Sequence, residues 1–199
     1  MDKKTLNIIY FNNVADKWDN MILHSPQKIS YFINLLGLDG GDKVLDVGTG
    51  TGILIPYLVE KVKESGHIDA IDISSMMIKI AKKRYHFSNL NFIVGDVETF
   101  DFNGRKYNCI TCYSVFPHIE QWRKTLRRFF NILEEGGKIG IFHSSSREYI
   151  NNIHKNNGFH LKNHKLPPGE EFALILREVG FSITNIIDDE EMYLIIGIK

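Results

Sequence analysis

The residues best placed to do chemistry are a glycine-rich turn and the acid that precedes it. Asp46 is followed by Gly48, Gly50 and Gly52. Glycines at alternate positions allow a sharp turn and let a ligand approach the backbone without interference from Cβ atoms. The spacing is one residue shorter than the G-x-G-x-x-G of dinucleotide-binding proteins, and a carboxylate at Asp46 would repel a pyrophosphate. The turn therefore favours a ligand that carries a positive charge.

Two further acidic motifs follow the next two predicted strands. Asp72 ends the second strand, where a carboxylate can accept hydrogen bonds from both hydroxyls of a ribose; it could instead cap the helix that follows. Asp96, Val97 and Glu98 come after the third strand. A carboxylate there could accept from an adenine amino group, with the Val97 N–H on a ring nitrogen, or the motif could be a polar turn. Acids after three consecutive strands together indicate a nucleoside site.

The elements that must position these turns alternate along the chain. Apolar runs predict strands at 43–47, 67–73, 91–94, 107–113, 138–142, 181–187 and 192–198, and helical spacing predicts helices at 53–63, 75–84, 121–133 and 170–178 after a helical segment that reaches about residue 41. This alternation implies a doubly wound, Rossmann-like α/β fold with helices on both faces of a seven-stranded, mostly parallel sheet. The last two strands are too close together for a parallel crossover. We therefore expect one antiparallel C-terminal strand, at the edge of the sheet.

Composition narrows the class of protein further. The chain has 199 residues and a formal net charge of zero, which argues against nucleic acid as a partner. No apolar run approaches the roughly 20 residues of a membrane span. Cys109 and Cys112 fall within a predicted strand, where we expect buried thiols rather than a redox pair. These features predict a soluble cytoplasmic protein with one domain over 1–199, and they leave its oligomeric state open.

Residues 43–143 resemble the class I methyltransferases that depend on S-adenosylmethionine (SAM). The similar motifs are the segments 44–52, 72–77, 95–98, 107–119 and 133–138. The upstream segment 11–19 is similar to the F-x-x-V-A-x-x-Y/W-D of ubiquinone/menaquinone-type methyltransferases, which implies that residues 1–41 form a helical cap over the cofactor. The resemblance implies a SAM site, with S-adenosylhomocysteine as product, formed by Trp18, Asp46, Gly48, Thr49, Gly50, Gly52, Asp72, Ile73, Met77, Asp96, Val97, Glu98 and Tyr113.

The resemblance implies methyl transfer to a small-molecule acceptor, for which proximity and alignment are worth about 7–11 kcal/mol. Candidate acceptor residues are His118, after the fourth strand, and His143 and Arg147, after the fifth; Arg147 could hold a carboxylate or phosphate. Each also has a structural interpretation, as a packed histidine or a solvated arginine. Residues 144–168, where the resemblance is weakest, are the expected acceptor-side segment. RNA or protein methylation, and SAM or nucleotide binding without catalysis, remain alternatives.

Two further groups of residues bear on the site. Asn108 and Tyr113 depart from the usual residues of the fourth-strand motif, so the acceptor is not carried over from the family. His154, His160 and His164 lie close together in the sequence, but neighbouring Asn-Gly and Pro-Pro pairs favour irregular structure, and we predict no metal site. Asp69, inside the second strand, is expected to be an edge or surface charge.

Overall fold

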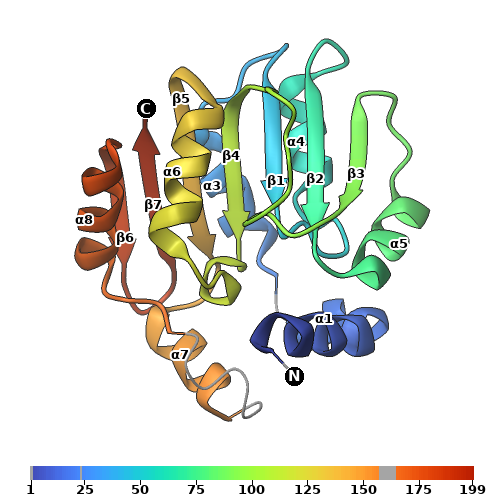
Figure 1. Cartoon of the computed structure of the whole chain (residues 1–199), viewed down its shortest axis with the longest axis vertical. Coiled ribbons are helices and arrows are strands. Elements are labelled where there is room, and N and C mark those ends of the chain that lie inside the picture. The colour runs from blue at the N-terminus through green and yellow to red at the C-terminus, as the bar shows by residue number, and fades with distance from the viewer. Residues whose placement is uncertain (1, 23, 157–164) are drawn as a thin grey trace. The chain divides into compact units, whose positions relative to one another are not determined.

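A computed structural model describes the chain except for residues 1, 23 and 157–164 and the side chains of residues 154 and 156. The chain forms two compact units, Met1–Asp101 and Phe102–Lys199. In each unit, parallel strands alternate with helices (Figure 1). Among the described residues, none of the helices combines the length and the apolar character that a membrane crossing requires.

The first unit carries the three strands that lead to the predicted nucleoside site. Its elements are α1 (Lys3–Val14), the 3-10 turn η1 (Ala15–Lys17), α2 (Trp18–Met21), α3 (Pro26–Leu36), β1 (Lys43–Val47), α4 (Ile55–Val62), β2 (His67–Asp72), α5 (Ser75–Arg84) and β3 (Leu90–Val94). β2 pairs in parallel with β1 on one side and with β3 on the other. Val47 lies opposite Ile71, and Asp72 lies opposite Val94. The three strands therefore end side by side.

Local sequence explains where these elements begin and end. Ser25 caps α3 by accepting from the Lys28 N–H, and Gly37 ends that helix in the left-handed conformation that glycine adopts readily. Ser74 caps α5 by accepting from the Met77 N–H. Because Ser74 fills this role, the carboxylate of Asp72 is not the N-cap of α5 and belongs to the loop at the end of β2.

The second unit contains the remaining strands. Its elements are β4 (Tyr107–Tyr113), the 3-10 turn η2 (Phe116–His118), α6 (Trp122–Ile132), β5 (Leu133–His143), α7 (Arg147–Asn156), α8 (Gly169–Val179), β6 (Ser182–Asp188) and β7 (Tyr193–Ile198). β4 and β5 are parallel, and β7 runs antiparallel to both β5 and β6. α6 and α8 pack against each other and cover the strands of this unit on one face (Figure 1).

The seven strands are ordered β3-β2-β1-β4-β5-β7-β6, which confirms the predicted fold class. The antiparallel strand is β7, as expected, but its predicted place at the edge is wrong, because β6 forms that edge. Burial explains the difference. Residues 193–197 of β7 are all buried, as in a strand with neighbours on both sides, whereas no residue of β6 is fully buried.

The junction between α6 and β5 also differs from the prediction. The strand was expected to begin at residue 138, but α6 ends at Ile132 and β5 already begins at Leu133. Tyr107 pairs with Leu133 while Cys109 pairs with Lys138. The intervening residues 134–137 form an irregularity inside the strand, which apolar periodicity does not report. Cys109 is a buried free thiol, and so is Cys112, as predicted.

Candidate functional site

The glycine turn is held against the end of β2 by its own backbone. The N–H groups of Gly48 and Thr49 donate to the Ile71 carbonyl oxygen over 2.8 and 3.1 Å. The Gly50 N–H donates to Asp72 Oδ2 over 2.9 Å. The structure thus brings the glycine turn and the second-strand acid together, as their positions at adjacent strand ends require.

The Asp72 carboxylate has two backbone donors and capacity for more. Its Oδ1 accepts from the Ser74 N–H over 2.8 Å, while its Oδ2 accepts from Gly50. Burial raises the pKa of this carboxyl from 3.8 to about 6, and the two N–H donors limit the rise. Each carboxylate oxygen offers two lone pairs. At neutral pH Asp72 can therefore accept hydrogen bonds from a vicinal diol as well.

Other residues of the glycine turn leave polar atoms that a ligand could use. Asp46 is buried, with 1% of its surface exposed, at the end of β1. Thr49 is 6% exposed, and its hydroxyl has no hydrogen-bond partner among the described residues. Gly52 has a φ of +89°, and Ile73 is half-buried after Asp72. A buried hydroxyl without a partner costs free energy, so Thr49 fits a turn shaped to hold a polar ligand.

The third acidic motif is already engaged by the N-terminal helix. Lys4 Nζ on α1 lies 2.5 Å from Asp96 Oδ2 and 3.6 Å from Glu98 Oε2. Asp96 Oδ1 accepts from the Glu98 N–H over 2.9 Å. Partial burial would lower the pKa of Lys4, but the hydrogen bond and charge of Asp96, with the charge of Glu98, raise it overall. An adenine amino group at Asp96 would therefore share that carboxylate with an ammonium.

The N-terminal segment contacts the other two loops as well. Asn12 Oδ1 accepts from the Ser74 hydroxyl over 2.8 Å and from the Met76 N–H over 3.2 Å. Trp18 Nε1 lies 3.8 Å from the position that a Cβ on Gly50 would occupy. Each of the three strand-end loops in this unit is thus in contact with residues 3–21.

Asp19 makes the strongest of these connections. Its Oδ1 accepts from the Thr51 hydroxyl over 2.6 Å, and its Oδ2 pairs with the Arg84 guanidinium at the end of α5. Lys4, Asn12 and Asp19 were not predicted as site residues. The only available signal was the segment 11–19, which contains Asn12 and ends with Asp19.

The remaining predicted cofactor residues lie in two different settings. Met77 is 1% exposed and Val97 is 9% exposed, both in the first unit. Tyr113 belongs to the second unit, where its hydroxyl lies 3.0 Å from Ser144 Oγ and its ring stacks on Phe142 with 5.3 Å between centroids. The ends of β4 and β5 are therefore lined by an aromatic pair with a polar rim.

A buried histidine and tyrosine lie at the end of β5. His143 is 1% exposed and pairs across the sheet with Tyr193, the first residue of β7, with 6.1 Å between the ring centroids. The Tyr193 hydroxyl has no hydrogen-bond partner among the described residues. Burial, with the nearby charge of Asp188, raises the pKa of Tyr193 far above its usual range. Tyr193 is therefore a hydrogen-bond donor at this site, and one that sequence patterns did not indicate.

The other two candidate acceptor residues are placed less favourably. His118 is half-buried at the end of η2. Arg147 Nε donates to both carboxylate oxygens of Asp188, over 2.9 and 3.2 Å, and Asp188 also accepts from the Gly169 N–H. The Arg147 guanidinium thus has a carboxylate partner within the chain. An anionic ligand would have to compete with Asp188 for it.

Two predictions about charged side chains remain. Asp69 is not a surface charge: it is 1% exposed and accepts from the Asn91 side chain over 2.8 Å. Of the histidine group, His160, His164 and the side chain of His154 lie outside the described residues. Within the rest of the chain, no cluster of three or more potential ligands could hold a metal ion.

Comparison with known proteins places these motifs in a family. Residues 44–137 match the family model described as a methyltransferase domain. The malonyl-[acyl-carrier protein] O-methyltransferase 1 of Ilyobacter polytropus is 32% identical over 75% of this chain and 56% of its own length. The ubiquinone/menaquinone biosynthesis C-methyltransferase UbiE of Edwardsiella ictaluri is 28% identical over 70% of this chain and 59% of its own length. The chain thus spans less than two thirds of these curated relatives.

Solved structures share the fold at low sequence identity. A methyltransferase in complex with the Trm112 activator of Haloferax volcanii has a TM-score of 0.79, with 18% identity over 94% of this chain and 96% of that one. The magnesium protoporphyrin IX methyltransferase of Synechocystis with bound SAH has a TM-score of 0.75, with 18% identity over the whole of both chains. At this identity the likeness concerns the fold.

Proposed function

We propose that this chain, which belongs to the class I SAM-dependent methyltransferases, transfers the methyl group of SAM to a small-molecule acceptor. The observation that carries the proposal is the set of acids at the ends of β1, β2 and β3, with the glycine turn attached to Asp72. The curated relatives are named for methylation of a malonyl group and of a quinone precursor. Both names support a small acceptor group.

The residues of the first unit fit SAM by charge and by shape. The buried carboxylate of Asp46 would pair with the α-ammonium group, and Asp72 would accept from the ribose hydroxyls. Asp96 would accept from the adenine amino group, with Val97 and Met77 beside the base. SAM supplies an activated methyl group on a sulfonium, so the protein need only bind, orient and exclude water.

The second unit supports the choice of a neutral acceptor. Tyr113, Phe142, His143 and Tyr193 offer aromatic surface, a phenol donor and an imidazole, whereas the one arginine in this group is paired with Asp188. Among the described residues of this group no cation is unpaired, which disfavours an anionic acceptor. We infer that Tyr193 donates to an oxygen of the acceptor, and that His143 takes the proton of a hydroxyl nucleophile where one must be removed.

Calorimetric titration of the purified chain tests the proposal. We expect SAM and S-adenosylhomocysteine to bind with micromolar affinity, and NADH to bind at least about 100-fold more weakly, because a pyrophosphate would face Asp46. If the chain binds SAM, methyl transfer would then be measured with phenols and quinols as neutral acceptors, and with a malonyl thioester, which carries a free carboxylate, as the anionic comparison. Preference for NADH, or no binding of SAM by folded protein, would contradict the proposal.

The affinity for SAM should fall in mild acid. Asp72 has a pKa of about 6 in the ligand-free protein, and only the ionised form accepts from both ribose hydroxyls. Affinity is therefore complete above pH 7 and decreases as the pH falls through 6, by about tenfold at pH 5. The contribution of Asp72 to the free energy of unfolding changes in the opposite direction. The folded chain binds the proton at a higher pH than the unfolded chain does, so this contribution rises as the pH falls from 6 toward 4. Titration between pH 5 and pH 8 measures the first effect, and equal affinity throughout would contradict it.

Removing the hydroxyl of Thr51 should also weaken SAM binding. Thr51→Val keeps the shape of a buried side chain but ends the hydrogen bond to Asp19, which is worth about 1.5 kcal/mol when one partner is charged. We expect affinity to fall about tenfold, because the N-terminal segment is then held less firmly on the glycine turn. A double-mutant cycle with Asp19→Asn isolates the Thr51 hydrogen bond, because Asp19→Asn removes the ion pair with Arg84 equally with and without Thr51→Val. Thr184→Val, which removes a hydroxyl from β6, is the control and should bind like the native chain.

A further inference from the structure

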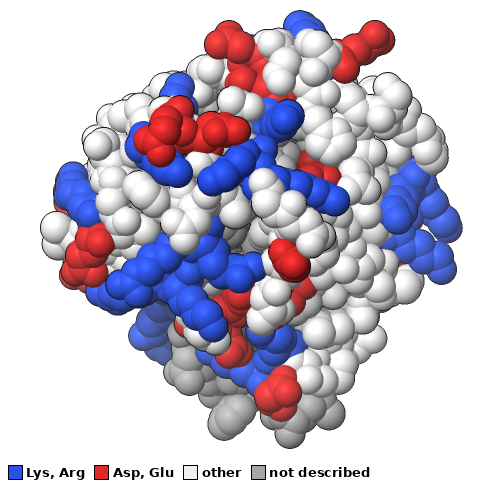
Figure 2. Space-filling model, turned by 45° about the horizontal axis from the view of Figure 1, so that its top comes forward, with Lys and Arg blue, Asp and Glu red and all other residues white. Residues whose placement is uncertain are grey.

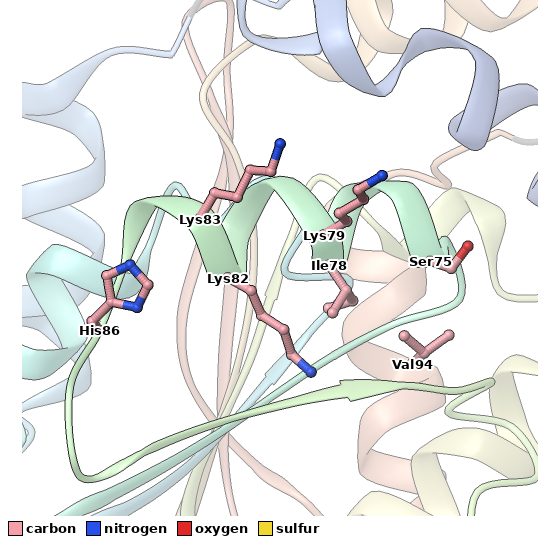
Figure 3. Close-up of a pocket in the computed structure, with 7 residues that line it drawn as sticks. All are labelled: Ser75, Ile78, Lys79, Lys82, Lys83, His86 and Val94. Atoms are coloured by element: carbon pink, nitrogen blue, oxygen red, sulfur yellow. The ribbon is translucent and has the colours of Figure 1, made fainter.

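An open groove runs between α5 and β3, on the outer side of the first unit (Figure 3). Its volume is about 550 Å³, and its lining residues are Ser75, Ile78, Lys79, Lys82, Lys83, His86 and Val94. Figure 3 shows Lys82 reaching from α5 toward the strand beneath it. The groove is distinct from the loops that hold Asp46, Asp72 and Asp96, and the proposed methyl transfer gives it no role.

The charge of this groove is entirely positive. Lys79, Lys82 and Lys83 recur at the spacing of one face of α5, and His86 follows the end of that helix. No acidic residue is among the lining side chains. The three lysines are exposed and form no hydrogen bond or ion pair within the described part of the chain. Figure 2 shows basic side chains gathered on the side of the molecule where Figure 1 places α5. Lysines in a last helical turn stabilise the helix dipole, which explains Lys82 and Lys83 but not Lys79.

The strand below the lysines presents a free edge. Among the described residues β3 pairs only with β2. The Asn89 carbonyl oxygen accepts from Ile68, and the Gly95 N–H donates to Asp72. A parallel ladder uses alternate residues, so the backbone groups of Leu90, Phe92 and Val94 point away from β2. The Leu90 N–H donates to the Phe87 carbonyl oxygen over 3.3 Å, so the edge offers the Leu90 carbonyl oxygen and the groups of Phe92 and Val94.

Nothing in the sequence of β3 blocks pairing with another strand. Natural sheets usually protect an edge with a charged residue or a proline in the strand, and residues 90–94 contain neither. Val94 is 51% exposed, and Phe87, just before the strand, is 41% exposed. The edge therefore offers backbone hydrogen bonds and apolar surface directly beneath a row of cations.

We propose that the outer edge of β3 binds an extended, acidic segment of a partner protein, which adds as a further strand. Strand addition provides the affinity through backbone hydrogen bonds, and alternate side chains provide the specificity. Because successive side chains point to opposite faces, acids at every second position would meet Lys79 and Lys82. The lysines favour an acidic segment and repel a basic one, so they select among partners that could pair with an open edge.

Fluorescence anisotropy with synthetic peptides tests this on the full chain. The probe is a labelled peptide of about ten residues in which glutamate alternates with valine. We expect saturable binding that weakens about tenfold between about 0.05 M and about 0.5 M salt, and no binding of a peptide in which lysine replaces glutamate. An N-methylated copy keeps the charge but loses alternate N–H donors. Equal binding of that copy would show that the groove recognises charge alone, and this result would overturn strand addition.

Matched variants locate the binding. Lys79→Glu with Lys82→Glu should abolish peptide binding, whereas Lys124→Glu, an exposed change on α6, should not alter it. Val94→Glu should repel the peptide, and Leu174→Glu on α8 is its control, since Leu174 is similarly exposed at 55%. These positions are exposed, so circular dichroism should show an unchanged fold. Unaltered binding in the groove variants would refute the proposal, and so would binding of phosphatidylglycerol vesicles without binding of the acidic peptide.

Discussion

Asp72→Asn is expected to weaken the binding of SAM by about two orders of magnitude while the chain remains folded. Asparagine has the shape of aspartate but only one acceptor oxygen. The native carboxylate accepts from the N–H groups of Gly50 and Ser74, and the proposed site adds the ribose hydroxyls. Hydrogen bonds to a charged partner contribute about 1.5–3 kcal/mol each, and about 2.7 kcal/mol corresponds to a 100-fold change in Kd. Calorimetric titration with SAM measures the loss.

A second aspartate on the same strand separates binding from stability. Asp69→Asn also alters a buried carboxylate of β2, one that accepts from the Asn91 side chain and lies 3.3 Å from His67 Nε2. This position is remote from the strand ends, so we expect a lower midpoint of thermal unfolding with native affinity for SAM. If Asp72→Asn bound SAM as tightly as the native chain, the nucleoside would have to lie elsewhere.

The arrangement of the first unit follows from patterns that are local in the sequence. The boundaries of α5 agree with the prediction, because Ser74 supplies a cap and the apolar residues keep helical spacing. Asp46 and Asp72 lie near each other because neighbouring parallel strands have their carboxyl ends on the same side of the sheet. The sequence alone shows that each of these strands has an acid at its end. Secondary structure and the choice of candidate acids could therefore be predicted.

The differences arise where tertiary contacts decide. β7 lies between β5 and β6. The sequence does carry a signal for this order, because β7 is apolar at almost every position whereas β6 mixes apolar and polar residues. Asp69 lies inside β2, and its hydrogen bond to the Asn91 side chain depends on which strand lies beside β2. Because the sequence does not report that neighbour, the bond could not be predicted. The irregularity at 134–137 requires knowledge of how β4 and β5 pair.

The contacts of the N-terminal segment could not be predicted either. Lys4 meets Asp96 across 92 positions of the chain, and Asn12 meets Ser74 across 62. Single polar residues on a helix resemble ordinary solvated positions, and only the folded chain shows which of them face an acid or a helix terminus. Tyr193 is a similar case, because its burial depends on strand pairing with His143.

Gly52→Ala is expected to produce the largest loss of stability among these variants, together with loss of SAM binding. Gly52 has a φ of +89°, and a Cβ there would lie 2.7 Å from Tyr85 Cε2 and 2.9 Å from Tyr85 Cδ2. The strained backbone costs about 1–2 kcal/mol, and displacing a packed ring costs about 1–3 kcal/mol. The collision is relieved by displacing the Tyr85 ring or the glycine turn, and the turn carries the Gly50 N–H that bonds to Asp72. We therefore expect the thermal midpoint to fall by about 5–15 °C and the affinity for SAM to fall at least tenfold.

Gly104→Ala distinguishes the backbone penalty from the collision. Gly104 has a similar φ of +73°, but nothing lies within 4 Å of the Cβ that alanine would add. This variant should lose only the backbone component, about 1–2 kcal/mol, and should bind SAM like the native chain, because Gly104 belongs to no strand-end loop. Thermal unfolding and calorimetry on both variants give the comparison. Equal losses of stability in the two variants would mean that Tyr85 moves aside at no cost. Any loss of SAM affinity in Gly52→Ala would then come from the changed conformation of the glycine turn alone.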